Sequence, residues 1–378
     1  MKFETFKAGV WQQRYQYKSF EPVLVDHEWL WQDPAINTLL EAANRALGEL
    51  NAFSLIVPDI DLFIEMHVVK EAQTSSRIEG TQTGMDEALM PEDQIQPEKR
   101  DDWREVRNYV DAVNAAIAEL ATLPLSNRLL KRTHEILMRG VRGEHKQPGE
   151  FRTSQNWIGG SSLADAVFIP PHPDGVPAMM GDLEKFWHDE TIQVPHLIRL
   201  AISHYQFETI HPFLDGNGRI GRLMITLYFV HAGVLNQPVL YLSDFFERNR
   251  SAYYDNLSRV RSQNDIRQWF RFFLVGVIET ANKATNGLRE ILRLKKECLE
   301  VRIPRIGRQT QAAPKLLNHL FQQPIVWAEE VMKATGQSSP SAYKIMSDFE
   351  RIGILREITG NKWGRIYRFE EYFKVFEG

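Results

Sequence analysis

The sequence predicts a mainly α-helical fold, in which a helical core carries one short β-hairpin flap and is followed by a C-terminal winged helix-turn-helix domain. Three observations support this. Most apolar segments repeat at the spacing of a buried helix face. Residues 149–171 contain two adjacent glycines and an apolar run ended by two prolines, which is typical of a hairpin. From residue 310 the chain changes to short helical segments and a second hairpin pattern.

These patterns divide the chain into an N-terminal helical region over 1–95, a core over 96–305 and the C-terminal domain over 310–378. In the first region, an aromatic-rich lead precedes helices expected over 34–50 and 59–73. Gly80 would end the second helix just after Ser75 and Glu79. These two residues lie four apart, so they share one helical face. The polar segment 90–100, which holds two prolines, is expected to link this region to the core.

The sequence of the core predicts five helices around the hairpin. A further helix is expected to follow them and to run back toward the start of the fifth. The five helices are expected over 103–120, 127–138, 176–189, 197–210 and 219–233. Asp244 and Glu247 predict a capping box that opens the returning helix. The segment 301–311, with Pro304 and Gly307, is expected to be a loop that ends the core.

The C-terminal region predicts three helices and a hairpin, which together resemble a winged helix-turn-helix. The helices are expected over 312–322, 325–335 and 339–353, and the hairpin strands over 354–358 and 365–369. This region contains nine basic and eight acidic residues, so its net positive charge is only weak support for DNA binding. DNA binding therefore stays open beside two alternatives, homodimer formation and the presentation of protein targets.

Composition narrows the class of protein. The 378 residues are 43% hydrophobic, which is enough to bury a sizeable core. The single cysteine excludes a disulfide framework, and the net charge of −4 gives no overall attraction to nucleic acid. We find neither a signal-peptide pattern nor a run of 18 apolar residues. The sequence therefore predicts a cytoplasmic protein without membrane contact.

The segment 211–222, HPFLDGNGRIGR, concentrates the candidate site residues. Gly216 and Gly218 let the chain turn tightly around Asn217 and aim consecutive N–H groups at one anion. The helix that follows points its positive end at the same place. Arg219 and Arg222 lie three apart on that helix, and their guanidinium groups suit phosphate oxygens. The segment therefore predicts a polyphosphate site.

Two further residues of this segment have chemistry that fits such a site. Asp215 is a hard oxygen ligand for the Mg²⁺ that accompanies a polyphosphate, although a helix N-cap is its alternative role. His211 suits proton transfer near neutral pH, although many single histidines only end helices. The overlapping GxGxxG pattern is not a dinucleotide fingerprint because a helix precedes it, and no Gly-Lys-Ser/Thr of a P-loop follows.

At these residues the chain resembles the Fic-domain family. Its signature His-x-Phe-x-Asp-Gly-Asn-Gly-Arg-x-x-Arg is matched at every specified position from His211 to Arg222. The segment 75–80, SSRIEG, resembles the family's inhibitory motif, and its position resembles the subclass with an inhibitory helix ahead of the core. The resemblance spans about residues 50 to 300. It implies an all-helical catalytic core that transfers AMP from ATP to a protein hydroxyl and releases pyrophosphate.

The resemblance also implies a role for each motif residue. His211 would take the proton from a Tyr, Thr or Ser hydroxyl, Asp215 would hold Mg²⁺, and Glu79 with Ser75 would inhibit by occupying Arg222. The nucleotide would lie on Gly216, Asn217, Gly218, Arg219 and Arg222, with Gln206, Arg248 and Tyr254 as further candidates for which core or surface roles are equally open.

The expected partner is a protein target that adds a strand to the 149–171 hairpin, and self-modification and homodimer formation are also open. Plain connection is the alternative role of that hairpin. Two other functions remain: removal of AMP or transfer of another phosphate-linked group, and DNA-binding regulation by a core that only senses nucleotide.

Overall fold

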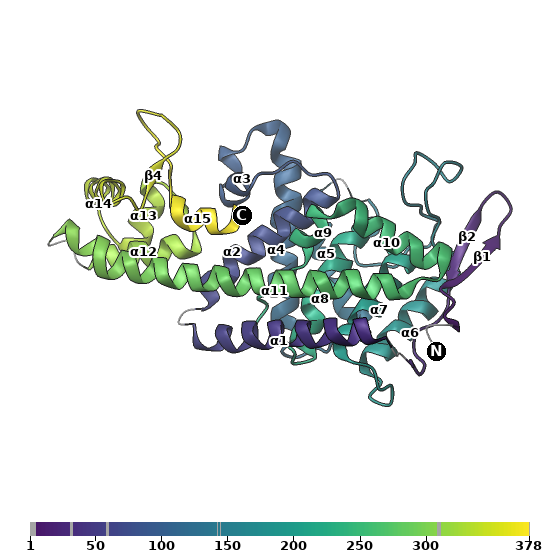
Figure 1. Cartoon of the computed structure of the whole chain (residues 1–378). Helices are drawn as coiled ribbons and strands as arrows, with labels where there is room; N and C mark the ends of the chain where they lie inside the picture. The colour runs from purple at the N-terminus through teal and green to yellow at the C-terminus, as the bar shows by residue number, and fades with distance from the viewer. Residues whose placement is uncertain are drawn as a thin grey trace.

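The computed structural model describes residues 5–30, 33–57, 60–141, 143, 145–307 and 311–377. The chain is mainly helical, as predicted (Figure 1). No helix in these ranges combines the length and the apolar character needed to cross a membrane. The helices ahead of the central pair are α1 (Pro34–Ile56), α2 (Ile60–Ile78), α3 (Met85–Leu89), α4 (Arg100–Glu119), α5 (Asn127–Leu137) and α6 (Val176–His188).

A central helix pair carries the 211–222 segment. It consists of α7 (His196–Ile210) and α8 (Asn217–His231), and every residue of α7 after the first is buried. The apolar side chains on all sides of both helices explain why neighbouring helices cover the pair completely. The buried indole of Trp269 ties the pair to a later helix by donating to the Ala201 carbonyl at 2.8 Å. The loop between α7 and α8 is therefore held inside the helical core.

After α8 the chain returns through α9 (Ser243–Arg248) and α10 (Arg250–Gln263). The predicted capping box at Asp244 is wrong, because the helix already begins at Ser243 and no side chain caps it. The Asp244 carboxylate instead accepts hydrogen bonds from Arg248 at 3.2 Å and from Lys283 at 3.0 Å. Asp244 thus ties α9 to the next helix.

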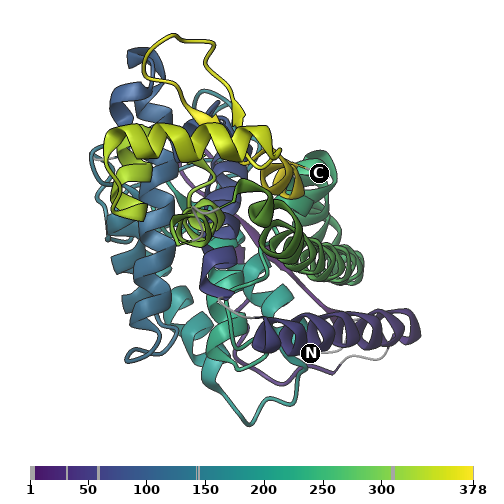
Figure 2. The same ribbon diagram turned by 90° about the vertical axis from the view of Figure 1, so that its left-hand side faces the viewer.

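The longest helix, α11 (Ile266–Glu297), forms a spine between the core and the C-terminal region (Figure 1). In both views α1 lies along α11 (Figure 2). The chain continues through a π-helical turn, Cys298–Arg302, and a 3₁₀ turn, Ile303–Ile306, so the predicted loop is wrong up to Ile306. Arg302 holds these turns by pairing with Glu297 and Glu371, both at 2.7 Å.

The C-terminal region is a helical module with a small antiparallel sheet. Its elements are α12 (Ala312–Gln322), β3 (Ile325–Val326), α13 (Ala328–Thr335), α14 (Ser339–Arg351), β4 (Arg356–Glu357), β5 (Tyr367–Arg368) and α15 (Glu370–Glu377), and the strand order is β3-β5-β4. The helix predicted over 325–335 is wrong at its start, because two β-branched residues pair with β5 instead. The winged-helix assignment stays an interpretation, and the boundary placed at residue 310 lies outside the described residues.

The sequence analysis missed a regular hairpin near the N-terminus. Strand β1 (Gly9–Gln13) pairs with β2 (Lys18–Pro22), and the Phe20 N–H of β2 donates to the Ile169 carbonyl at 3.0 Å. The hairpin expected over 149–171 has only one antiparallel bridge, Ile158 with Phe168, so it is shorter than predicted. The N-terminal hairpin therefore lies against the flap and supports it (Figure 1).

Candidate active site

The loop from α7 to α8 is fixed by a side chain of its own motif. His211 ends α7 in the left-handed conformation, with φ of 51°, and Gly216 begins α8 with φ of 72°. The Asn217 amide accepts from the Phe213 N–H at 2.7 Å and donates to the Phe213 carbonyl at 2.8 Å. A Cβ on Gly216 would lie 3.0 Å from the Met138 sulfur, so glycine meets both the backbone and the packing requirement.

This geometry gives the start of α8 the features of an anion-binding position. The first N–H groups of a helix have no carbonyl four residues earlier to accept from them. Because the Asn217 side chain is used within the loop, Asn217 can offer a ligand only its backbone N–H, beside that of Gly218. The Gly216 N–H already donates to Asp215 Oδ1 at 2.6 Å, so the N–H groups of Asn217 and Gly218 are the ones that this turn can offer to a ligand.

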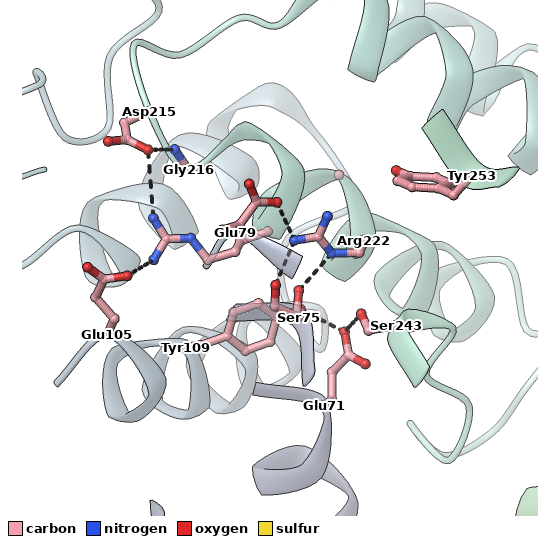
Figure 3. A network of polar contacts seen from close by, with 12 residues as sticks. Glu71, Ser75, Glu79, Glu105, Tyr109, Asp215, Gly216, Arg222, Ser243 and Tyr253 are labelled. Carbon is pink, nitrogen blue, oxygen red and sulfur yellow. Dashed lines mark hydrogen bonds and ion pairs between the residues drawn. The ribbon is translucent and has the colours of Figure 1, made fainter. Parts of the chain in front are cut away.

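Arg222 is buried and bound by helix α2 (Figure 3). Its guanidinium donates to Glu79 Oε1 at 2.6 Å, to Ser75 Oγ at 2.8 Å and to the Ser75 carbonyl at 2.9 Å. Burial raises the pKa of Glu79, but the charge and hydrogen bond of Arg222 outweigh it, so the pKa of this carboxyl lies below its usual value. Glu79 is therefore an anion at neutral pH, and the contact implied by the family resemblance is present.

Glu79 also lies directly against the glycine nest. A Cβ on Gly218 would come within 2.2 Å of Glu79 Oε1 and 2.9 Å of Arg222 Nη1. The carboxylate thus fills space beside the first turn of α8 that a bound phosphate would need.

Arg219 contacts two carboxylates other than Glu79. Its guanidinium lies 3.3 Å from Glu105 and 3.8 Å from Asp215 Oδ1. Asp215 and Arg219 line a hollow of about 280 Å³, here called the Asp215 hollow, which Glu79 also borders. Within the described residues no three His, Cys, Asp or Glu side chains converge as metal ligands. Asp215 as a single carboxylate fits a Mg²⁺ ion whose remaining ligands are phosphate and water.

A larger cavity, of about 560 Å³, is also bordered by Glu79. We call it the His211 cavity. His211, Gly218, Arg222 and Tyr254 of the predicted site residues line it. Gln206 and Arg248 do not. The Gln206 amide is buried and donates to the Val23 carbonyl at 2.9 Å, and Arg248 pairs with Asp244.

His211 is held by its main chain and kept neutral by its surroundings. Its carbonyl accepts from Arg152 Nε at 2.9 Å and from Asn156 Nδ2 at 3.2 Å. Burial, and then the nearby Arg152 charge, lower the pKa of the His211 imidazole to about 3. A neutral ring at pH 7 can accept a proton, and the negative charge of a bound polyphosphate would raise its basicity.

The sequence analysis missed Glu208, which lines the His211 cavity one helical turn before His211. Its Oε1 atom is buried without a hydrogen-bond partner among the described residues, and burial raises the pKa of Glu208 to about 7. A Cβ on Gly221 would lie 2.2 Å from this oxygen, so the last motif glycine makes room for the carboxyl. The three-residue spacing from His211 was the one sequence signal for this residue.

The returning helix supplies the other residues that the sequence analysis missed. Arg250, Tyr253 and Arg261 of α10 line the His211 cavity, and the Arg261 guanidinium lies 3.9 Å from the Phe168 ring centre of the flap. No motif marks them, because their place depends on how α10 packs back over α7 and α8.

Comparison with known proteins agrees with this geometry. A model of the Fic/DOC family N-terminal region matches residues 37–118, and the Fic/DOC family model matches residues 124–229. Proteins named protein adenylyltransferase Fic from Drosophila erecta and Culex quinquefasciatus are each 36% identical over 125 residues. That match covers 33% of this chain and 22% of each relative, so it spans about a fifth of the relatives' length.

Solved structures show the same fold over more of the chain. A Fic family protein from Desulfovibrio desulfuricans matches 91% of this chain and 98% of its own with a TM-score of 0.56 at 22% identity. A Fic domain containing signaling protein from Bacteroides thetaiotaomicron matches 66% of this chain and 97% of its own with a TM-score of 0.54 at 18% identity. Both family models, the complete motif and the shared fold lead to one conclusion: the chain belongs to the Fic family.

Proposed function

We propose that this protein is an adenylyltransferase that moves AMP from ATP to a hydroxyl side chain of a target protein. One observation carries the proposal: the His211 imidazole, the first turn of α8 at Gly218 and the Arg222 guanidinium line a single cavity of about 560 Å³. The names of the relatives that match over the motif support the same activity.

The chemistry needs few groups from the protein. The target oxygen attacks the α-phosphorus of ATP in line, the bond to the β-phosphate oxygen breaks, and pyrophosphate leaves. His211 takes the proton of the attacking hydroxyl, while the backbone N–H groups of Asn217 and Gly218 stabilise charge on the phosphates. Catalysis then depends mainly on positioning and electrostatics, as in phosphoryl transfer generally.

Mg²⁺ fits the Asp215 side of this site. The carboxylate lines its own hollow beside Arg219, and Mg²⁺ commonly combines one or two carboxylates with substrate phosphates. The ion would neutralise phosphate charge there.

Glu79 is proposed to inhibit by two effects at one place. It occupies the guanidinium edge of Arg222 that would receive the terminal phosphate, and it borders both the His211 cavity and the Asp215 hollow. Glu79 therefore stands where a triphosphate would pass from one to the other. A nucleotide bound beside Glu79 would hold its α-phosphorus out of line, and a small misplacement costs on the order of 10²-fold in rate.

The target is proposed to lie along the flap, where Val167 is exposed beside the His211 cavity. Exposed backbone at such a bridge can pair with an extended segment. Self-modification would need an internal hydroxyl to reach the same place. The C-terminal module would serve target presentation, dimer formation or DNA binding.

The test is incubation with α-labelled ATP, Mg²⁺ and lysate as the pool of targets. We expect Glu79→Gly to label targets and itself more strongly than wild type, and Glu79→Gly combined with Arg222→Ala to lose that gain. Mass spectrometry of labelled protein identifies the group transferred. Detection of another phosphate-linked group on the target would overturn the proposal of AMP transfer. Labelling by Glu79→Gly that is no stronger than labelling by wild type would overturn the proposal of inhibition by Glu79. Salt-sensitive DNA binding by a protein that transfers no group from ATP would favour the alternative function, a DNA-binding regulator whose core only senses nucleotide.

A further inference from the structure

Helix α10 presents one face to the His211 cavity, with an arginine at each end of that face. The lining residues of α10 are Arg250, Tyr253, Tyr254, Leu257, Ser258 and Arg261. Because they recur at intervals of three and four residues, they lie on one side of the helix. The charge that α10 brings to the cavity is therefore that of the two arginines.

Neither Arg250 nor Arg261 is paired with a carboxylate in the part of the chain that the structure describes. Arg222, which lines the same cavity, is bound by Glu79 at 2.6 Å. Glu208 also lines the cavity, but burial raises its pKa to about 7, so this carboxyl is only partly ionised at neutral pH. The α10 side of the cavity therefore carries surplus positive charge.

Arg261 is the arginine that packing holds in place. Its guanidinium carbon lies 3.9 Å from the ring centre of Phe168 in the flap, a cation–π contact. The side chain is half-buried, and burial lowers the pKa of the guanidinium, so the charge is partly removed from water. A guanidinium stacked on a ring keeps its N–H edge for a planar anion such as a carboxylate. Arg261 is therefore oriented to bind an anion beside the flap.

The position of Arg261 distinguishes the two molecules that would meet in the cavity. Under the proposed function the phosphates of ATP lie on the first turn of α8 and on Arg222, and the adenosine part of ATP carries no charge. Phe168, which the guanidinium covers, forms the flap bridge with Ile158, where a target segment is proposed to pair. The anion that meets Arg261 should therefore come from the target.

We propose that Arg261 binds an aspartate or glutamate side chain of the target, close in sequence to the hydroxyl that receives AMP. Arg250, which is exposed, would add a weaker attraction that salt screens. The preferred substrate is then an acidic segment that contains Tyr, Thr or Ser. This inference rests on the proposed function for the transfer step, whereas the preference for acidic segments can also be measured as binding.

The test uses the full chain with Glu79→Gly, labelled ATP and pairs of short synthetic peptides. Both peptides of a pair contain the same Tyr, Thr or Ser, flanked in one by glutamates and in the other by lysines. We expect kcat/KM for the glutamate peptide to be at least about tenfold higher. Arg261→Gln should remove this preference and leave the KM for ATP unchanged, and Arg261→Glu should reverse the preference. Arg259→Gln is the matched control, because Arg259 of the same helix pairs with Asp265 at 3.0 Å and does not line the cavity.

A reversed preference in Arg261→Glu would support the contact, because a damaged fold would lower the rates with both peptides. Equal rates with both peptides in the Glu79→Gly protein would overturn the inference. A raised KM for ATP with an unchanged peptide preference in Arg261→Gln would also overturn it and would assign Arg261 to the nucleotide.

If no variant labels any peptide or lysate protein, the proposed function fails, and the role of Arg261 is decided by binding. Fluorescence anisotropy of dye-labelled peptides measures their affinity for wild type and for Arg261→Glu. Tighter binding of the glutamate peptide by wild type, lost in Arg261→Glu, supports the contact. Equal affinity of wild type for both peptides overturns it.

Discussion

Arg222 is the residue at which the inhibited and active arrangements would differ. Ser75 contributes two of its three acceptors, one from the side chain and one from the main chain. Ser75→Ala removes only the hydroxyl, so we expect a gain in AMP transfer that is several-fold smaller than that of Glu79→Gly. Initial rates with labelled ATP measure it. Ser76→Ala is the control, because the neighbouring hydroxyl does not contact Arg222. A gain equal to that of Glu79→Gly would contradict this ranking.

His211 should matter for the rate and little for nucleotide affinity. Its imidazole is placed to accept a proton, while the phosphates are expected on backbone N–H groups and arginines. In the Glu79→Gly background, His211→Ala should lower AMP transfer by about 10²–10⁴-fold and leave ATP affinity nearly unchanged. Single-turnover rates and equilibrium binding separate the two. His145→Ala, at an exposed histidine, should change neither. A His211→Ala enzyme of near wild-type rate would remove His211 as the base.

The site residues that could be predicted from the sequence are those that lie within one motif. The glycine nest, the two arginines and the contact between Glu79 and Arg222 follow from local spacing and from the family resemblance. Glu208 and Arg261 were missed because their place beside His211 depends on packing between helices. Gln206 shows the converse error, since its helical position turns it toward Val23 and away from the cavity.

Among the elements, the flap gives a test of how targets dock. The Ala166 N–H makes no hydrogen bond within the described ranges, and its neighbour Val167 is 77% exposed. If a target strand pairs here, Ala166→Pro should reduce target labelling at least tenfold, because proline removes the donor. Ala166→Ser keeps the N–H and should have little effect. Self-labelling and circular dichroism check the fold. Equal target labelling by both variants would rule out strand addition at this residue.

Most helices ahead of residue 240 could be predicted from periodicity, whereas α11 and α15 were not predicted. Apolar spacing identified α7 and α8 nearly to their ends, because both are covered on every side. Strand β3 was taken for helix, since two residues are too few to show alternation. The N-terminal hairpin was missed although its strands are neighbours in sequence, because β1 is almost wholly exposed and so shows no alternation of buried and exposed residues. Its contact with the flap, from Phe20 to Ile169, joins segments about 150 residues apart, and such a contact leaves no periodic signal.

For the whole molecule, buried ionisable groups predict how stability changes with pH. Burial lowers the pKa of His134 to about 4 and that of His204 and His211 to about 3, whereas burial raises the pKa of Glu208 to about 7 and also raises that of Glu71. Between about pH 4.5 and 6.5 the unfolded chain therefore binds up to three protons more at these histidines, and the native chain binds up to one more at Glu208.

The histidine protons outnumber the opposing glutamate protons, so the free energy of unfolding should fall as pH falls through this window. Urea unfolding between pH 7.5 and 4.5 measures it. Glu208→Gln removes one opposing proton and should make the decline steeper. Stability that rises on acidification would contradict the placement of the three histidines.

The bond between Glu79 and Arg222 also affects the stability of the protein in the absence of nucleotide. Only 1% of the Arg222 side chain is exposed, against 36% of Glu79, so the arginine is the buried partner. A buried cation deprived of its counter-charge is strongly destabilising. A variant without Glu79 would therefore lack a counter-charge for Arg222 until a phosphate of ATP supplies one. The stability of that variant, and hence its abundance, would then rise with the ATP concentration in the cell.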